Sequence, residues 1–149
     1  MPGPDPMVPF ALIAAVATPR STPSHYPPPF AALMSGRVKR PLGDPFGIQR
    51  FGVNHVRLAA GASSALMHVH SVQDEWIYVL SGELTLIRDT DESIIGAGMC
   101  AGFAAGGRAH MLVNRTRETA CYLEVGDRQA DDSVSYPRDD VKSVREPHG

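Results

Sequence analysis

Apolar and polar residues alternate over short stretches through the middle of the chain, and turn residues separate the stretches. A period of two is typical of β-strands, because successive side chains point to opposite faces of a sheet. The pattern predicts strands over 51–58, 65–70, 75–80, 83–87, 99–103, 110–114 and 120–125. Short strands at such regular spacing favour a sandwich or a barrel. The predicted fold class is therefore all-β.

Turn residues supply the connections between these segments. Ser81-Gly82 is predicted to be a two-residue hairpin connection, and residues 89–92 are predicted to form the next turn. Upstream of the strands, residues 30–34 are expected to form a short helical turn that Gly36 ends.

Proline divides the chain. Nine of the thirteen prolines lie before residue 30, and none lies between Pro45 and Pro137. Because proline has no backbone N–H to donate, the sheet is expected in the proline-free stretch. This predicts an extended Pro-rich N-terminal arm over 1–45, a barrel over 46–127 and an acidic C-terminal tail over 128–149 that is irregular and solvated.

Composition narrows the class of protein. At 149 residues the chain fits one domain, and 14 Lys+Arg against 16 Asp+Glu argue against nucleic-acid binding. The apolar run over 8–17 is interrupted by Pro9 and is too short to span a bilayer, and no basic residue precedes it. We therefore expect no membrane association and a cytoplasmic location. Cys100 and Cys121 are expected to be ordinary buried thiols.

Candidate chemistry centres on His68-Val69-His70. Residues two apart on a strand project from one face, so both imidazoles can converge on one point. Glu75 follows after a short bend, and His110 lies on a later strand that could close over the same point. Such a set would suit a divalent transition metal (Mn, Fe, Ni or Zn) with positions open to water or substrate. The alternative is a pair of surface or hydrogen-bonded histidines without a metal.

The spacing around these residues resembles two family signatures. One set resembles the first signature of the cupin superfamily: Gly61, His68, His70, Glu75 and Gly82. The other set resembles the second signature: Gly98, Phe103, Gly106, His110 and Asn114. Outside the signatures, residues 26–30, 42–44, 51–54, 125–128 and 136–137 resemble those of small bacterial single-domain cupins. The resemblance covers the chain from about residue 19 to residue 140.

The resemblance implies a double-stranded β-helix, a jelly-roll barrel with His68, His70, Glu75 and His110 as metal ligands in its mouth. Alternation then sends Leu66, Ile77 and Val79 inward. It also predicts an apolar outer face, formed by Met67, Val69, Trp76, Tyr78 and Leu80. Either the N-terminal arm or a second subunit is needed to cover that face, and we expect a homodimer.

Two functions are open at this point. The first is a metal-dependent enzyme acting on a small polar metabolite with a carboxylate or carbonyl, such as a dioxygenase, isomerase or decarboxylase. The second is a non-catalytic sensor or binding protein for a sugar or other small ligand, with a structural metal or none. Two departures from the second signature slightly favour the non-catalytic protein. Ala104 replaces the usual proline, and His110 lies one residue further from Gly106 than in the signature.

Supporting groups are less well defined by the sequence. His55 and Tyr78 are the only candidate general bases, and Tyr78 is predicted to point away from the cavity. Arg57 and Arg108 either hold an anionic substrate or are ordinary surface residues.

Overall fold

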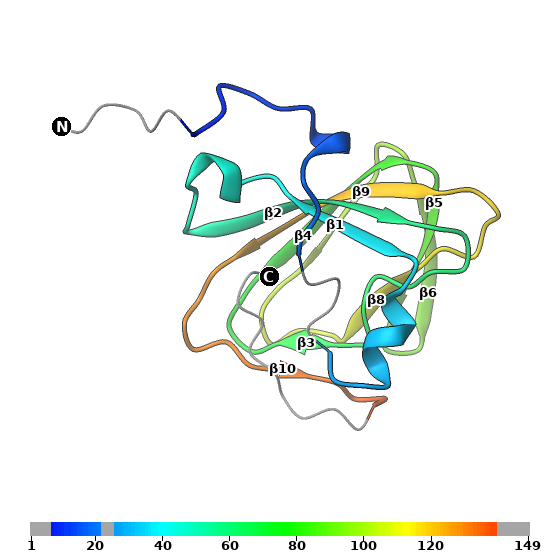
Figure 1. The fold of residues 1–149 in the computed structure, drawn as a ribbon. Coiled ribbons are helices and arrows are strands. Elements are labelled where there is room, and N and C mark those ends of the chain that lie inside the picture. Colours follow the sequence, from blue (N-terminus) through cyan, green and yellow to red (C-terminus); the bar gives the residue numbers. More distant parts are fainter. Residues whose placement is uncertain (1–6, 22–25, 140–149) are drawn as a thin grey trace.

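Strands dominate the computed structural model, which describes residues 7–21 and 26–139 (Figure 1). The strands are β1 (Arg37–Pro41), β2 (Phe51–Leu58), β3 (Val69–His70), β4 (Glu75–Ser81), β5 (Glu83–Arg88), β6 (Asp91–Gly96), β7 (Cys100–Phe103), β8 (His110–Val113), β9 (Ala120–Asp127) and β10 (Val134–Ser135). Short 3-10 helices are η1 (Ala14–Val16), η2 (Phe30–Met34) and η3 (Asp44–Phe46). The all-β prediction and the helical turn over 30–34 are confirmed.

The strands form antiparallel sheets that share one core. The larger sheet has the order β1-β2-β9-β4-β7, and the smaller has the order β6-β5-β8. A third, two-stranded pair joins β10 to β3 at one end of the barrel (Figure 1). Apolar side chains from both larger sheets pack together in the interior, as the pattern of alternating inward residues requires.

The inward face of the larger sheet is apolar at one end and polar at the other. Leu58 lies opposite Ala120, and both are fully buried in the core. Further along the same face, Glu124 lies opposite Asn54 on one side and Ile77 on the other. The apolar end holds the sheets together, and the polar end is where a functional site can form.

The connection at Ser81 and Gly82 is not a hairpin, so that prediction is wrong. β4 pairs with β7 and β9, whereas β5 pairs with β6 and β8. The chain therefore passes from one sheet to the other here, and the β4–β9 register shifts between Val79 and Ser81. Gly82 has a φ of 77°, and a Cβ there would lie 2.8 Å from the Cα of Ala120. Only glycine fits this corner without strain.

Strands β1, β6 and β10 are additions to the predicted set. β6 follows a turn of only two residues, Asp89 and Thr90, because Asp91 already pairs with Arg88. The turn predicted over 89–92 is therefore too long. β6 is an edge strand whose side chains are mostly exposed, so burial imposes little alternation on its sequence.

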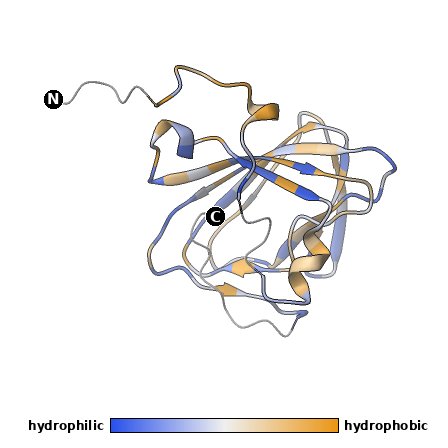
Figure 2. Ribbon diagram, viewed as in Figure 1, coloured by the Kyte–Doolittle hydropathy of each residue, from blue (hydrophilic) through white to orange (hydrophobic). Residues whose placement is uncertain are grey.

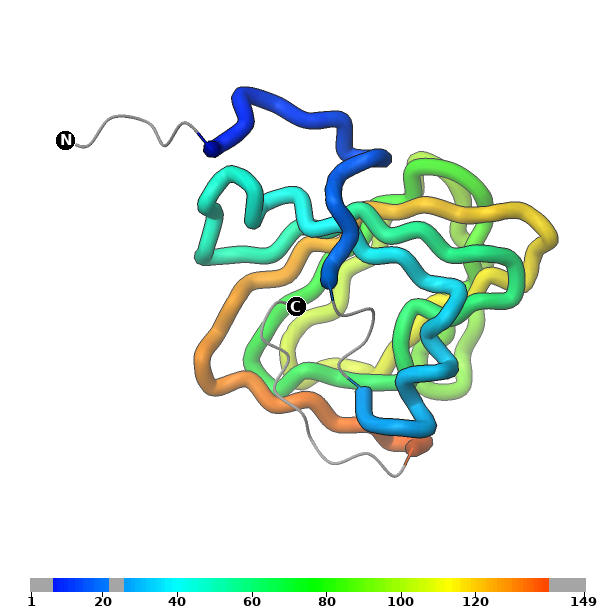
Figure 3. The backbone as a smooth tube through the Cα atoms, viewed as in Figure 1, coloured from blue at the N-terminus to red at the C-terminus, as the bar shows by residue number. Residues whose placement is uncertain are grey.

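The acidic tail is not wholly irregular or solvated. Val134 of β10 lies opposite His70 of β3, and Figure 3 shows the two segments side by side. Val134 and Tyr136 are buried in a cluster with Leu66. Asp132 is only 7% exposed, which contradicts the prediction for that residue. Asp140, also predicted to be solvated, lies outside the described residues.

The outward-facing side chains of β4 are exposed, as predicted. Trp76, Tyr78 and Leu80 have exposed fractions of 40%, 36% and 40%. Met67 lies on the side opposite His68, as predicted, but it is buried, packs with Val69 against Ile87 and so does not belong to the exposed face of β4. The reason is that the segment around His68 bridges to β8 of the smaller sheet, whereas β4 belongs to the larger one.

The described part of the N-terminal arm does not shield the outer face of β4. It runs beside β1, where the Arg20 N–H donates to the Lys39 carbonyl and the Arg40 side chain donates to the Ala17 carbonyl.

Cys100, opposite Tyr78 on β7, is exposed, so the expectation of a buried thiol is wrong there.

Among the described residues, no helix has the length and apolar character needed to cross a bilayer. The cytoplasmic location stays a prediction.

Candidate metal centre

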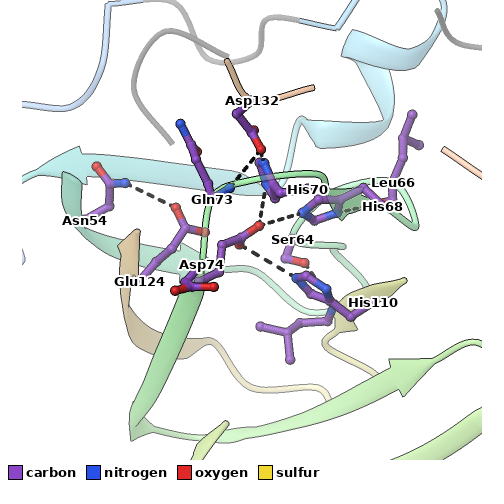
Figure 4. A network of polar contacts seen from close by, with 12 residues as sticks. Asn54, Ser64, Leu66, His68, His70, Gln73, Asp74, His110, Glu124 and Asp132 are labelled. Atoms are coloured by element: carbon purple, nitrogen blue, oxygen red, sulfur yellow. Dashed lines mark hydrogen bonds and ion pairs between the residues drawn. The ribbon is translucent and has the colours of Figure 1, made fainter. Parts of the chain in front are cut away.

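The four residues singled out by the sequence come from segments of three different sheets. His70 lies in β3, Glu75 begins β4 and His110 begins β8. His68 precedes β3 and forms an isolated antiparallel bridge with His110. All three histidines are buried, and the Glu75 side chain is 14% exposed. Figure 4 shows the three imidazoles turned toward one region.

His68, His70 and Glu75 form the tightest part of this group. One ligand atom from each lies within 4.8 Å of the others, so the group could hold a metal ion. The Nε2 atom of His68 is 3.2 Å from Oε1 of Glu75, and Nε2 of His70 contacts the same oxygen. Gly126 lies opposite Glu75 on β9, and the lack of a side chain there leaves room for the carboxylate.

His110 reaches the group through backbone pairing. The His110 N–H donates to the His68 carbonyl at 2.9 Å, and the reverse bond is 3.1 Å. Directly opposed residues carry their side chains on the same face, and the two rings lie 4.5 Å apart. Phe103 stacks on the other side of the His110 ring at 3.6 Å. Nε2 of His110 is 3.7 Å from Oε2 of Glu75.

Hydrogen bonds orient two of the imidazoles. Nδ1 of His68 is 2.8 Å from the Leu66 carbonyl, which can only accept, so Nδ1 carries the proton. Nδ1 of His70 is 2.6 Å from a carboxylate oxygen of Asp132. Both rings therefore present Nε2 to Glu75, and this is the nitrogen available to a metal.

The carboxylate sets the charge balance of the group. Burial alone would raise the pKa of Glu75, but the neighbouring His110 and His68 side chains hold it well below its usual range. Burial opposes protonation of His70, yet Glu75 and Asp132 raise its pKa to about 9. Burial lowers the pKa of His110. Glu75 is therefore an anion amid imidazoles, a donor set that fits a divalent transition metal.

A cavity adjoins the group at the polar end of the larger sheet. Besides the four residues, its lining includes Lys39 and Glu124. The Lys39 ammonium is 3.0 Å from Oε1 of Glu124, and the Asn54 amide donates to the same oxygen at 3.1 Å. The space that a water-sized molecule can occupy is about 30 Å³. That is enough for an ion with one or two waters.

Sequence reasoning missed these charged residues of the cavity. Lys39 lies in a segment predicted to be an arm, and Glu124 was included in a strand without a role. The alternation that places Ile77 inward could have identified Glu124, because Glu124 lies opposite Ile77. Lys39 could not be found this way, since its strand was not predicted.

The remaining candidates lie away from the cavity. Arg108 pairs with Asp89 and Asp91 on the surface, and Arg57 is exposed. His55 is buried, but it lies between the inward-facing Asn54 and Val56 and so points to the other side of β2. Tyr78 faces outward. Of the candidate bases and arginines proposed from sequence, none lines the described cavity.

The structure is a small β-barrel with histidines and a carboxylate lining its cavity. Comparison with known proteins identifies the family to which such a barrel belongs. Residues 54–126 match the Cupin domain family. A sugar phosphate isomerase of the cupin superfamily from Silicibacter pomeroyi is 40% identical with a TM-score of 0.81, covering 87% of this chain and 82% of that one. The chain belongs to the cupin superfamily, and the predicted double-stranded β-helix is confirmed.

Two further structures are similar. A candidate sugar phosphate isomerase from Acidithiobacillus ferrooxidans is 35% identical with a TM-score of 0.67, covering 68% of this chain and 65% of that one. A polyketide cyclase from Streptomyces resistomycificus is 20% identical with a TM-score of 0.64, covering 79% of this chain and 78% of that one, and shows the shared fold alone. No curated protein is significantly similar to the chain.

Proposed function

We propose that this cupin is a metal-dependent enzyme that isomerises a small phosphorylated sugar. His68, His70, Glu75 and His110 would hold the divalent metal (Mn, Fe, Ni or Zn). The observation that carries the proposal is that the cavity beside these ligands also contains the ion pair between buried Lys39 and partly buried Glu124. A passive binding site needs no such proton-accepting carboxylate next to its metal ligands.

Glu124 is suited to moving a proton. Lys39 and Asn54 both donate to Oε1, so they fix the carboxylate and leave Oε2 as the proton acceptor. A bound metal would polarise the carbonyl oxygen of the substrate as a Lewis acid. Glu124 would take the proton from the carbon next to that carbonyl. The C–H electron pair becomes the new C=C bond, and the carbonyl π pair moves to oxygen.

The reaction is completed by returning that proton. Glu124 delivers it to the former carbonyl carbon while the hydroxyl proton crosses to the neighbouring oxygen, so no atom or electron is gained or lost. Isomerisation is the class favoured among those predicted because two similar structures are named for it. The small free volume implies that only the reacting end of the substrate enters, with the phosphate outside.

Hydrogen exchange tests the proposal directly. Protein purified without an affinity tag is analysed for metal and then incubated in D2O with glucose 6-phosphate, mannose 6-phosphate or ribose 5-phosphate. We expect near-stoichiometric metal and loss of the C2 proton signal by NMR for at least one sugar, abolished by chelation. Metal-free protein carrying a firmly bound organic molecule would instead support a non-catalytic binding protein.

We also propose that two copies pair through the outer face of the larger sheet. Trp76 lies between Gly102 and Val125, and Tyr78 lies between Cys100 and Leu123. This face carries no charge at these positions, so two identical copies can meet without repulsion. Beside β1, the arm also exposes apolar side chains at Phe10, Ile13 and Val16, and Figure 2 shows it as largely hydrophobic.

Disrupting this face should separate the copies. Trp76→Glu combined with Tyr78→Glu is expected to convert a dimer to a monomer by light scattering, because paired burial of charge is costly. Ile94→Glu is the control, since Ile94 is 64% exposed on the edge strand of the smaller sheet. A wild-type monomer at the highest soluble concentration would contradict the proposal.

A further inference from the structure

Asp132 joins the C-terminal segment to a candidate metal ligand. It lies 62 residues from His70 in sequence, and its Oδ2 atom is 2.6 Å from Nδ1 of that ring. Both side chains are buried, with exposed fractions of 5% for His70 and 4% for Asp132. Figure 4 shows Asp132 beside His70 and Gln73.

The two oxygens of Asp132 have different partners. Oδ1 accepts hydrogen bonds from the backbone N–H groups of Val72 and Gln73, each at 2.9 Å. These donors fix the plane of the carboxylate, so that Oδ1 faces the backbone of Val72 and Gln73. Oδ2 is left facing His70. Two backbone N–H donors on one oxygen favour the ionised form of the Asp132 carboxyl group.

A carboxylate can only accept a hydrogen bond, so Nδ1 of His70 must carry a proton. Nε2, which contacts Glu75, is then the nitrogen that can give up its proton to a metal while Nδ1 stays protonated. Asp132 therefore selects the one neutral tautomer of His70 that can bind a metal at this position.

We propose that Asp132 is a positioning residue for the candidate metal centre, which holds His70 in its metal-binding tautomer and orientation. The inference rests on the proposed metal site. It gives the C-terminal segment a functional role, because β10 pairs with β3 and so brings Asp132 to the ligand.

Asparagine at position 132 is the sharpest test. The backbone N–H groups of Val72 and Gln73 require an oxygen, so the amide of Asp132→Asn must present its NH2 group to His70. That donor forces the ring proton onto Nε2, where it blocks metal binding. Asp132→Ala removes the carboxylate without imposing the wrong tautomer. It also removes the two backbone contacts that asparagine retains.

The two variants should rank oppositely in two measurements. By Co²⁺ titration, we expect affinity to fall about 10-fold in Asp132→Ala and about 100-fold in Asp132→Asn. By thermal unfolding without metal, Asp132→Asn should be the more stable of the two. A purely structural role predicts that alanine is worse in both. Asp131→Asn is the matched control, because Asp131 is exposed.

Nitrogen-15 NMR of the metal-free protein separates this inference from the proposed function. In the Glu75→Gln background, where the amide at position 75 can accept from or donate to Nε2, the neutral His70 ring should be protonated on Nδ1 when Asp132 is present and on Nε2 when Asp132→Asn is added. The same tautomer in both proteins, or unchanged Co²⁺ affinity in Asp132→Asn, would overturn the inference. Wild-type protein that binds no Co²⁺ would contradict the proposed metal site, while the tautomer would still decide the role of Asp132.

Discussion

Replacing both His68 and His70 by alanine is expected to abolish metal retention by the purified protein. Both rings present Nε2 to Glu75, so the double variant removes two of four proposed ligands. Loss of an outer-shell residue costs about 10–100-fold in affinity, so loss of two direct ligands should cost at least about 1,000-fold. Elemental analysis of tag-free protein measures the result.

The double variant also removes two hydrogen-bond partners of a buried carboxylate. Circular dichroism and thermal unfolding are therefore needed to show that the variant is folded. Glu75→Gln offers a second route, because it keeps the shape of the side chain while removing the anionic ligand. His55→Ala is the control, since His55 is a buried histidine on the other face of β2. Full metal content in the folded double variant would refute the assigned ligands.

Chelation should reveal the same site through stability. A metal that binds only the folded protein stabilises it by about 4 kcal/mol when its free concentration is about 1,000 times Kd. The melting temperature of wild-type protein should fall when the metal is removed, whereas that of the His68/His70 double variant should not change.

Glu124→Gln is expected to eliminate deuterium exchange into the sugar phosphate while leaving metal content unchanged. The amide oxygen of glutamine can still accept from Lys39 and Asn54, so the local structure should persist. Its NH2 group cannot take a proton from carbon. Loss of a general base costs about 10²–10⁴-fold in rate, and we expect a decrease in this range.

The exchange rate is followed by NMR at saturating substrate, so that a change in kcat is separated from a change in KM. Glu83→Gln is the matched control, because Glu83 is exposed at the start of β5. An exchange rate in Glu124→Gln equal to that of wild type would rule out Glu124 as the base and leave the metal site standing.

The local pattern of apolar and polar residues was sufficient to predict the bounds of a strand where the strand is long and one of its faces is buried. The prediction for 51–58 agrees with β2 at both ends, because its alternation is imposed by the core. β3 and β10 each have two residues, too few to show a period. Their pairing depends on a contact between segments more than 60 residues apart, as the His70–Asp132 separation illustrates. No local propensity encodes such a contact.

By itself, the sequence determined the fold class, the convergence of His68 and His70 on one face, and the identity of all four candidate ligands. The two-residue spacing of His68 and His70 is sufficient to predict that their side chains share a face, since alternate residues of a strand point to the same side. Only the tertiary structure showed that His110 opposes His68, that Lys39 and Glu124 meet in the cavity, and that Asp132 orients His70. These contacts arise from register between distant strands, which the packing of the whole barrel decides.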